Sequence, residues 1–234
     1  MGLYGRLLLP RIVRFACGLK PAMRQRRKVV PLAEGRVLEV GIGPGLNLPF
    51  YDRARVTRLW GLDPSPEMRA MARRAARAAG LELELLESGA DAIALEDGSV
   101  DTVLVTYTLC SIAQTQPALR EMGRVLKPGG KLIFCEHGAA PDPGVRRWQD
   151  RADPLWSRLG GGCHLNREIP RLIEQGGFAI DEMHTMYLPG WRPATFNYWG
   201  SARRAPGYCP RRAGRKPDLD QAKRTRRVHE SGSP

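Results

Sequence analysis

The chain has no long hydrophobic run. Its most apolar N-terminal stretch, residues 7–9, is followed at once by Pro10 and Arg11, whereas a membrane-spanning helix needs about 20 predominantly apolar residues. The stretch also lacks the hydrophobic region and the small-residue cleavage site of a signal peptide. We therefore expect neither a transmembrane helix nor a cleaved leader in this sequence.

Grouped cysteines are also missing. The five cysteines are odd in number, widely spaced and outside any CxxC or Cys/His ligand pattern: Cys17, Cys110, Cys135, Cys163 and Cys209. This arrangement argues against a disulfide framework and against a zinc site. The sequence therefore predicts no bound metal and a protein of the reducing cytoplasm.

The middle of the chain has almost no net charge. The formal net charge is +13, yet residues 1–30 hold eight Lys or Arg and no acid, and residues 200–234 hold ten against three acids. The nearly neutral middle does not offer the basic groove of a nucleic-acid channel, so we expect no nucleic-acid partner. The basic termini predict a weak contact with an anionic membrane surface, and a location at the membrane periphery would follow from it. The sequence carries no signal of oligomeric state.

The sequence does contain a regular alternation of short apolar runs and helical stretches. Strands are predicted at Val37–Val40, Val56–Leu62, Leu83–Leu86, Val100–Val105, Lys131–Cys135, Phe178–Met183 and Thr195–Trp199, and helices at Pro66–Ala79 and Pro117–Leu126. Such alternation is typical of a parallel sheet with right-handed crossovers. The predicted fold class is α/β: a Rossmann-like, doubly wound, mostly parallel seven-stranded sheet with helices on both faces.

Composition divides the chain into three parts. We predict a basic N-terminal helical segment over residues 1–30, a catalytic domain over 31–203 and a disordered basic tail over 204–234, where aliphatic residues are almost absent. Residues 3–19 show no clean two-faced pattern, so packing over a cofactor cleft and membrane contact both stay open. Within the domain, a long insertion rich in Trp, Pro and Gly precedes a helix ending near Gly176.

A glycine-rich turn follows the first predicted strand. Gly41, Gly43 and Gly45 permit a tight turn and a close ligand approach at the carboxyl edge of the sheet. Asp63 ends the second strand, 18 residues after Gly45, where a carboxylate can accept both ribose hydroxyls of a cofactor. These features suit both NAD and S-adenosylmethionine.

Two further features favour S-adenosylmethionine. Glu39, just ahead of the first glycine, can meet the ammonium of the methionine moiety directly or by orienting the loop, although it can also be a surface-facing strand end. Leu46 stands where the pyrophosphate-binding pattern has its third glycine. Asn47, Pro64 and Met68 complete the set that we expect around the cofactor.

A resemblance to a known family is carried by four segments: VLEVGIGPGLN, GLDPSPEM, DGSVDTVLVTYTLCS and RVLKPGGKLIFCEH. Over about residues 35–137 they resemble class I methyltransferases of the quinone-biosynthesis, or methyltransferase type 11, kind. Over residues 137–178 the chain is similar to methyltransferase-like alkyl-thiol S-methyltransferases and their bacterial relatives, in EHGAAPD, WQDRADPLW, GGCHLNR and GGF. The resemblance implies methyl transfer from S-adenosylmethionine to a small, lipophilic thiol, phenol or quinol.

The resemblance also implies where the cofactor lies. Its adenine is expected beside the turn after the third strand, at Gly89, Ala90 and Asp91, and its sulfur end near Thr106 and Leu109. Many relatives have an aspartate at the place of Gly89, so here the adenine contact must come from Asp91 or from backbone groups. Asp91 can equally be a solvated loop acid.

Proton chemistry is expected just after the fifth strand. Methyl transfer from a sulfonium is a direct displacement, so the protein must mainly align two reactants and exclude water. His137 is a candidate base for a thiol or hydroxyl acceptor, or else a residue that caps a loop. Asp153 is a second candidate base or an orienting group.

Apolar side chains of the insertion are candidates for the acceptor pocket. Trp148 and Trp156 can form a lid over a hydrophobic acceptor, although a core position is the more common one for tryptophan. Cys110 and Cys163 are interpreted as small apolar side chains of the same pocket rather than as nucleophiles.

Three other functions stay open. A nucleic-acid methyltransferase would use the basic termini, but Thr106–Ser111 lacks the Asn/Asp-Pro-Pro-aromatic stretch with which amino-group methylases grip a flipped base. A lipid or quinone methyltransferase at a membrane surface fits the basic N-terminus equally well. A cofactor-binding protein without turnover is the third, because a binding motif does not prove catalysis.

Overall fold

The computed structural model describes residues 15–208. The expectations for residues 1–14 and for the tail from residue 209 onward lie outside the described residues. Among the described helices, none is long and apolar enough to cross a membrane.

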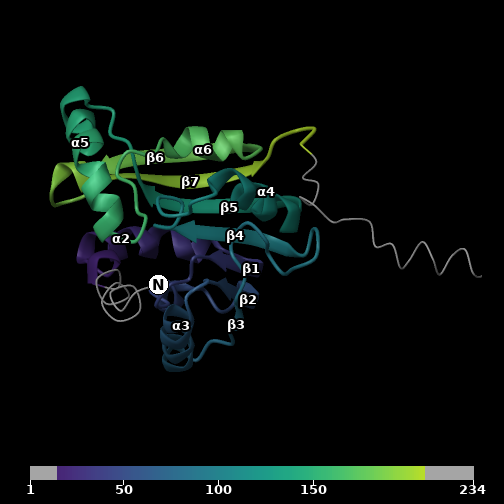
Figure 1. The fold of residues 1–234 in the computed structure, drawn as a ribbon. Helices are drawn as coiled ribbons and strands as arrows, with labels where there is room; N and C mark the ends of the chain where they lie inside the picture. Colours follow the sequence, from purple (N-terminus) through teal and green to yellow (C-terminus); the bar gives the residue numbers. More distant parts are fainter. Residues whose placement is uncertain (1–14, 209–234) are drawn as a thin grey trace, which may run out of the picture.

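Seven strands form one sheet, as the sequence predicts. They are β1 (Gly35–Val40), β2 (Val56–Leu62), β3 (Glu84–Leu86), β4 (Val100–Thr106), β5 (Leu126–His137), β6 (Phe178–Tyr187) and β7 (Phe196–Arg204). Their order is β3-β2-β1-β4-β5-β7-β6, from the bottom to the top of Figure 1. Strands β1 to β5 pair in parallel, and β7 is antiparallel to both β5 and β6. The predicted fold class is therefore confirmed.

The connecting helices are α2 (Lys20–Val29), α3 (Pro66–Ala79), α4 (Thr115–Val125), α5 (Pro143–Leu159) and α6 (Ile169–Gln175). Helix α3 has the predicted bounds because its ends are encoded locally. The Ser65 hydroxyl accepts a hydrogen bond from the Met68 amide, Pro66 suits the first turn, and Gly80 ends the helix with φ 61°. Helix α6 ends before Gly176, as expected.

Helix α5 is the element that the sequence analysis missed. No helix was predicted within the Trp-, Pro- and Gly-rich insertion, yet 17 of its residues are helical, with Pro154 inside the helix. Pro143 lies in the first turn, where its missing N–H costs nothing. Interior prolines and tryptophans weaken a helical signal in sequence, and here tertiary contacts override that weakness.

Two hydrophobic cores lie on the two faces of the sheet. Side chains of β4 alternate between them: Val103 and Val105 join the core with α4 and α6, whereas Leu104 joins the core with α2 and α3. This alternation is the period of two expected for a strand buried on both faces. Helices on both faces are thereby confirmed.

The register brings the carboxyl ends of the central strands to one edge. Val40 of β1 pairs with Val105 of β4, which pairs in turn with Phe134 of β5. Between β1 and β4 the strand order reverses, and in open α/β sheets such a switch point is where ligands bind. The loops after β1, β4 and β5 therefore meet at one place.

Candidate active site

Glu39 is a buried carboxylate at the end of β1, 1% exposed. Its oxygens accept hydrogen bonds from Asn47 Nδ2 at 2.9 Å and from the Tyr51 hydroxyl at 2.6 Å. Burial raises the pKa of Glu39 to about 7, partly offset by those bonds and by the charge of Arg26. The surface-facing alternative for Glu39 is wrong.

Arg26 of α2 enters the same site from the other side. Its Nη1 donates to Asn47 Oδ1 at 2.7 Å and to Thr106 Oγ1 at 2.6 Å, and Asn47 Nδ2 donates to the same Thr106 oxygen at 2.9 Å. Arg26 is 4% exposed, and its Nε is buried without a hydrogen-bond partner among the described residues. The sequence analysis missed both Arg26 and Tyr51, since neither belongs to a motif.

The glycine turn has the backbone that only glycine adopts easily. Gly41 has φ 71° and Gly43 has φ 54°. A Cβ on Gly41 would collide with the Thr108 side chain, whereas a Cβ on Gly43 would meet only the Gly41 carbonyl, at 3.9 Å. Gly43 therefore borders open space. Gly45 packs so closely against Leu48 and Ala72 that a Cβ would not fit, so glycine is required there for the packing of the turn on α3.

Asp63 lies at the end of β2, beside that open space. Its oxygens accept from the Gly43 amide at 3.0 Å and from the Ser65 amide at 2.9 Å. Burial raises the pKa of Asp63, against the lowering effect of both amides. Each oxygen keeps lone pairs for a further donor. Of the two neighbours that the sequence places near the cofactor, Pro64 is exposed and Met68 is buried.

The turn after β3 has fewer fixed contacts. Gly89 lies so close to the Asp91 carboxylate that a Cβ would collide with it, and the Asp91 side chain is exposed. Ala90 packs against the core. The Ser88 hydroxyl is buried without a hydrogen-bond partner among the described residues, and it is a polar group that the sequence analysis did not single out.

Glu136 organises the loop after β4. It is fully buried, and it accepts from the Thr108 amide at 2.8 Å and from the Leu109 amide at 3.1 Å. Burial raises its pKa to about 7. This carboxylate also escaped the sequence analysis, although it directly precedes His137. Leu109 is itself fully buried.

Three sulfur and nitrogen groups gather beyond this loop. His137 Nε2 lies 3.0 Å from Cys163 Sγ, and ligand atoms of Cys110, His137 and Cys163 all lie within 4.8 Å of one another. A hydrogen bond from the Cys110 thiol and the nearby His137 hold the pKa of Cys163 well below its usual range. Burial lowers the pKa of His137, but Cys163 and Glu136 outweigh it and the net direction is upward. The spacing of these residues had predicted no such group.

Backbone contacts hold the three residues together. The His164 amide donates to the Cys110 carbonyl at 2.9 Å. Asp153 accepts from the Leu165 amide at 2.7 Å and bonds His164 Nδ1 at 2.8 Å, so both of its oxygens fix the segment that carries Cys163. Arg167 donates to carbonyls of the segment that carries Cys110. These contacts fit the orienting role that the sequence analysis offered for Asp153.

The tryptophans of α5 are not core residues. Trp148 is 60% exposed and Trp156 is 36% exposed, so the expectation of a buried position is wrong for both. Trp156 donates from Nε1 to Cys163 Sγ at 3.4 Å and packs at a tilt against Trp191, with ring centroids 6.0 Å apart and ring planes 34° apart. Trp156 therefore borders the sulfur group, whereas Trp148 is largely exposed to solvent.

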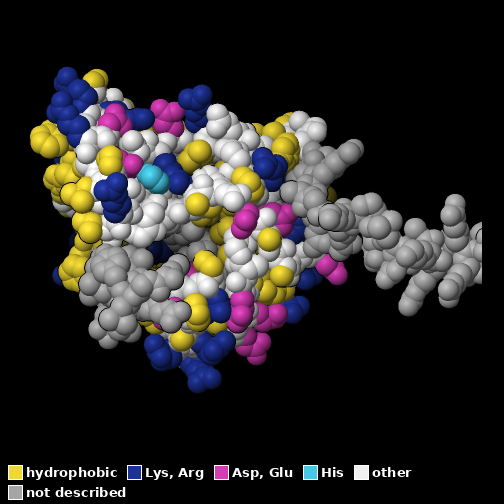
Figure 2. Space-filling view, viewed as in Figure 1, with side chains coloured by type: hydrophobic (Ala, Val, Ile, Leu, Met, Phe, Trp, Pro, Cys, Tyr) yellow, Lys and Arg dark blue, Asp and Glu magenta, His cyan; other side chains and the backbone are white. Residues whose placement is uncertain are grey.

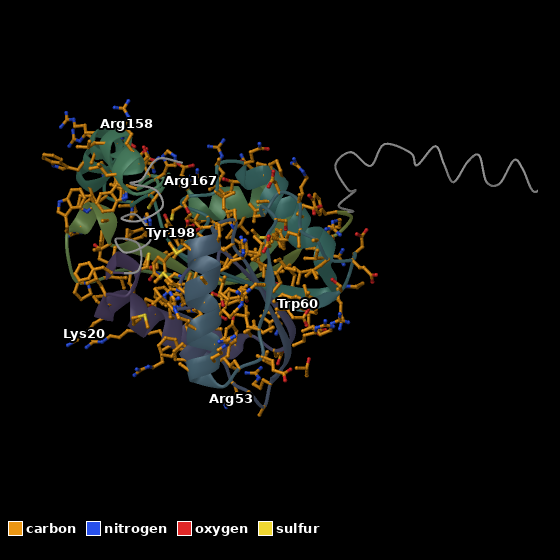
Figure 3. All side chains as sticks on the ribbon, turned by 60° about the horizontal axis from the view of Figure 1, so that its bottom comes forward. Lys20, Arg53, Trp60, Arg158, Arg167 and Tyr198 are labelled. Atoms are coloured by element: carbon orange, nitrogen blue, oxygen red, sulfur yellow. The ribbon has the colours of Figure 1, made fainter. Side chains whose placement is uncertain are left out.

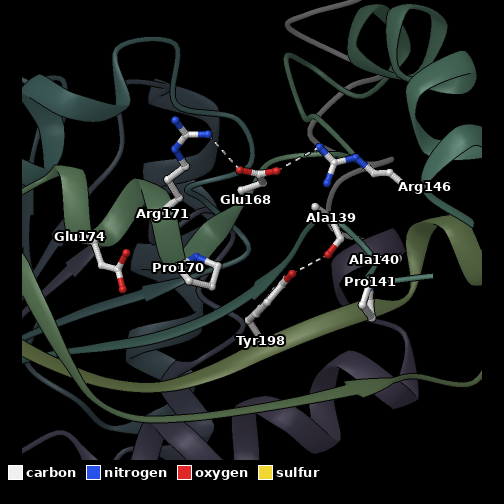
Figure 4. A pocket seen from close by; sticks show the side chains of 9 residues that line it. All are labelled: Ala139, Ala140, Pro141, Arg146, Glu168, Pro170, Arg171, Glu174 and Tyr198. Carbon is white, nitrogen blue, oxygen red and sulfur yellow. Dashed lines mark hydrogen bonds and ion pairs between the residues drawn. The ribbon is translucent and has the colours of Figure 1, made fainter. Parts of the chain in front are cut away.

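A separate pocket lies between α5, α6 and β7 (Figure 4). Three of its charged side chains pair with one another, since Glu168 bonds Arg146 at 3.4 Å and Arg171 at 3.5 Å. The Tyr198 hydroxyl donates to the Ala139 carbonyl. None of the predicted site residues lines it, so it contributes nothing to the site at the sheet edge.

The residues at the sheet edge fit S-adenosylmethionine. The two hydrogen-bond donors to buried Glu39 are neutral, so this carboxylate can still gain from a cation such as the ammonium of the methionine moiety. Arg26 offers a buried, unpaired Nε for a carboxylate. Open space at Gly43 lies beside Asp63, and the unpaired Ser88 hydroxyl lies just after β3.

Comparisons with known proteins agree with this geometry. A family model described as methyltransferase domain matches residues 38–134. Thiol S-methyltransferase TMT1B of Homo sapiens is 36% identical over 177 residues, which cover 73% of this chain and 72% of that protein. Demethylmenaquinone methyltransferase of Thermus thermophilus is 38% identical over 177 residues, covering 71% and 79%.

Solved structures share the fold. A protein of Thermotoga maritima described as an S-adenosylmethionine-dependent methyltransferase, possible histamine N-methyltransferase, superposes with a TM-score of 0.61 at 22% identity. The match covers 86% of this chain and 97% of that one.

Proposed function

This chain belongs to the S-adenosylmethionine-dependent methyltransferases, and from that premise we propose that it methylates the sulfur of a small, lipophilic thiol. The observation that carries the proposal is the group formed by Cys110, His137 and Cys163, which lies next to the loop where the methyl donor is expected. The similarity to thiol S-methyltransferases of Homo sapiens supports the same acceptor class.

The cofactor roles follow from the contacts around the glycine turn. Glu39 receives the ammonium and Arg26 the carboxylate of the methionine moiety, because opposite charges in a buried site gain most from pairing. Asp63 accepts the ribose hydroxyls, and Gly43 leaves room for the ribose. Ser88 and the Asp91 region contact the adenine.

The bound cofactor supplies an activated methyl group on a sulfonium. The chain's own residues then have two tasks, which are to align the acceptor sulfur with that methyl group and to keep water out. Glu136 serves the first task, because it fixes the amides of Thr108 and Leu109 and thereby the path of the loop into Cys110. The group formed by Cys110, His137 and Cys163 promotes proton loss from the acceptor sulfur.

An apolar flank supports a lipophilic acceptor and contact with a membrane surface. Trp148, Leu155 and Leu159 are 56–64% exposed and share one face of α5, and Trp191 is 52% exposed. In Figure 2 hydrophobic side chains line this flank with basic ones beside them. Figure 3 places Arg158 of α5 and Lys20 of α2 on the same flank, both pointing outward.

This flank favours a second candidate function, methylation of a quinol or lipid at an anionic bilayer. Exposed tryptophan and arginine together suit the interface of such a bilayer. With this function goes the proposal that the protein is cytoplasmic and peripheral to the membrane. The cysteines of the described residues are free, as is usual in a reducing compartment, and this supports the proposal. Binding to vesicles with and without anionic lipid tests it, with Trp148→Ser as the sensitive variant and exposed Met183→Ser of β6 as the control.

The experiment for the proposed function is a methyl-transfer assay that measures S-adenosylhomocysteine over a panel of thiols, phenols, quinols and RNA. We expect turnover of hydrophobic thiols, and none with Gly43→Val. Turnover of quinols or phenols alone would replace the proposed acceptor with the second candidate. Turnover of RNA alone would refute both.

A further inference from the structure

The group at the ends of β4 and β5 has the donor set of a soft metal. Thiolate sulfur and imidazole nitrogen are the ligands that zinc prefers in proteins. We propose that Cys110, His137 and Cys163 bind one Zn²⁺ ion, and that its fourth position binds the thiol acceptor. The second half of this inference rests on the proposed function, whereas the metal site itself does not.

The distances suit a tetrahedral ion. Zinc binds sulfur at about 2.3 Å and imidazole nitrogen at about 2.0 to 2.1 Å, so its ligand atoms lie roughly 3.4 to 3.8 Å apart. The three side chains already have ligand atoms within 4.8 Å of one another. The pair His137 Nε2 and Cys163 Sγ, at 3.0 Å, needs only a small opening to admit the ion.

The site is built into the fold rather than formed by loose surface residues. Cys110 is 2% exposed, and the His164 amide joins its carbonyl to the segment of Cys163. Asp153 fixes that segment through the Leu165 amide. Because the three ligands come from separate segments held by hydrogen bonds, the protein fixes the geometry before any ion binds.

A neighbouring donor serves one of the ligand sulfurs. Trp156 Nε1 donates to Cys163 Sγ at 3.4 Å. Hydrogen bonds to metal ligands orient them and tune the charge on the metal. This indole therefore has a role at the sulfur group that its exposed position on α5 does not otherwise explain.

Three protein ligands distinguish a reactive zinc from a structural one. Structural sites use four protein ligands, whereas catalytic sites use three and keep one position for water or substrate. The group has three members among the described residues. Cys17 lies close enough to Cys163 for the charge of that sulfur to help raise the pKa of Cys17, after the larger effect of burial, and Cys17 is the residue that would complete a structural site instead.

The step conserves atoms and electrons without a change of redox state. An acceptor RSH binds the zinc through sulfur and releases its proton to solvent. A sulfur lone pair then forms a bond to the methyl carbon, while the bond from that carbon to the sulfonium breaks and leaves its electron pair on the cofactor sulfur. The products are RSCH₃, S-adenosylhomocysteine and one H⁺, and zinc stays divalent.

The metal half is tested on the full chain, purified without metal-affinity chromatography, by elemental analysis and zinc titration. We expect about one zinc per chain and, with cobalt instead, the near-ultraviolet absorption of thiolate ligands. Cys110→Ser, Cys163→Ser and His137→Ala should each weaken zinc binding by at least about tenfold. Cys135→Ala, in the same strand as His137, and exposed His184→Ala are the controls and should bind zinc normally.

A measurement on the wild-type protein tests the metal site even if a variant fails to fold. Zinc should raise the midpoint temperature of unfolding of chelator-treated wild type but not of Cys163→Ser. No zinc uptake by the wild type would overturn the site. Loss of zinc in Cys17→Ser would make it structural and overturn the acceptor half.

The acceptor half is tested by thiol methylation in the presence and absence of zinc. We expect a chelator to stop turnover, zinc to restore it, and S-adenosylmethionine affinity to stay unchanged. Full thiol turnover by the zinc-free protein would overturn the acceptor half but leave the proposed function intact. Zinc-loaded protein that binds the cofactor and methylates no thiol would refute the proposed function and the acceptor half while leaving the metal site.

Discussion

The two halves of the site use different chemistry. The cofactor half, around the turns after β1 and β2, consists of carboxylates and backbone amides, such as Glu39, Asp63 and the Gly43 amide. The acceptor half, after β4 and β5, consists of sulfur and imidazole groups at Cys110, His137 and Cys163. The two halves share no side chain. A substitution in one half should therefore impair that half and leave the binding chemistry of the other half intact.

The largest effect is expected from Gly43→Val. A valine there fills the open space beside Asp63 and strains a backbone with φ 54°, so S-adenosylmethionine binding should be abolished in titration calorimetry, while zinc uptake stays normal. Gly129→Val is a matched control, since Gly129 has φ 80° and nothing within 4 Å of an added Cβ. It carries the same strain, about 1 to 2 kcal/mol, and should bind the cofactor normally. Equal loss in both variants would show that strain alone accounts for it.

His137→Ala should break the acceptor half alone. We expect kcat for the thiol to fall by at least about 10- to 100-fold, because the variant loses a ligand of the acceptor-binding zinc. The dissociation constant of S-adenosylmethionine should stay unchanged, because among the described residues the His137 ring bonds only Cys163. His184→Ala removes an exposed histidine of β6 and should leave kcat unchanged. An unaltered rate in His137→Ala would remove this residue from the reaction.

Asp63→Asn should weaken the cofactor half without destroying it. The amide keeps one acceptor oxygen, and hydrogen bonds to a charged group contribute about 1.5 to 3 kcal/mol. Affinity for S-adenosylmethionine should therefore fall about 10- to 100-fold in titration calorimetry. Asp181→Asn, at an exposed carboxylate paired with Arg203, is the control. Full affinity in Asp63→Asn would mean that this carboxylate does not meet the ribose.

The smallest effect is a pH dependence at Glu39. With its pKa at about 7 in the free protein, Glu39 loses its charge below neutral pH, so affinity for the cofactor cation should fall by up to about tenfold per pH unit. Calorimetry from about pH 5.5 to about pH 8 measures it. Glu39→Gln should remove this dependence, and an unchanged pH profile in that variant would assign it to another group.

The same shift has a consequence for stability of the free protein. The pKa of Glu39 is higher in the folded chain than its ordinary 4.5, so the folded state binds more protons between these values. Its contribution to the free energy of unfolding is full below pH 4.5 and is lost as the pH rises to about 7. Denaturant unfolding of the wild type and Glu39→Gln at both ends of this range measures the difference.

The two halves also differ in how far the sequence predicts them. Residues 39–47 form one continuous motif, and α3 carries its cap and stop signals in its own residues, so both could be predicted. Cys110, His137 and Cys163 are single residues of three separate segments, and only the pairing of β4 with β5 and the return of the chain after α5 bring them together. The role of Arg26 could not be predicted for the same reason, since its hydrogen-bond partners lie 21 and 80 residues away in the sequence.

Helix α5 was missed for a different physical reason. Its buried side includes two polar residues, Gln149 and Asp153, which bond loop backbone on either side of the helix. Its apolar side chains Trp148, Leu155 and Leu159 face outward. A pattern analysis that assigns apolar residues to the core therefore places the exposed face of this helix in the core and its buried face in solvent.

One contact joins the two halves. Gly41 lies so close to the Thr108 side chain that no Cβ fits between them, and Thr108 leads directly into Cys110. The Thr108 hydroxyl also donates to the Gly41 carbonyl at 3.4 Å, so the absence of a side chain at Gly41 sets how closely the cofactor turn and the acceptor loop approach each other.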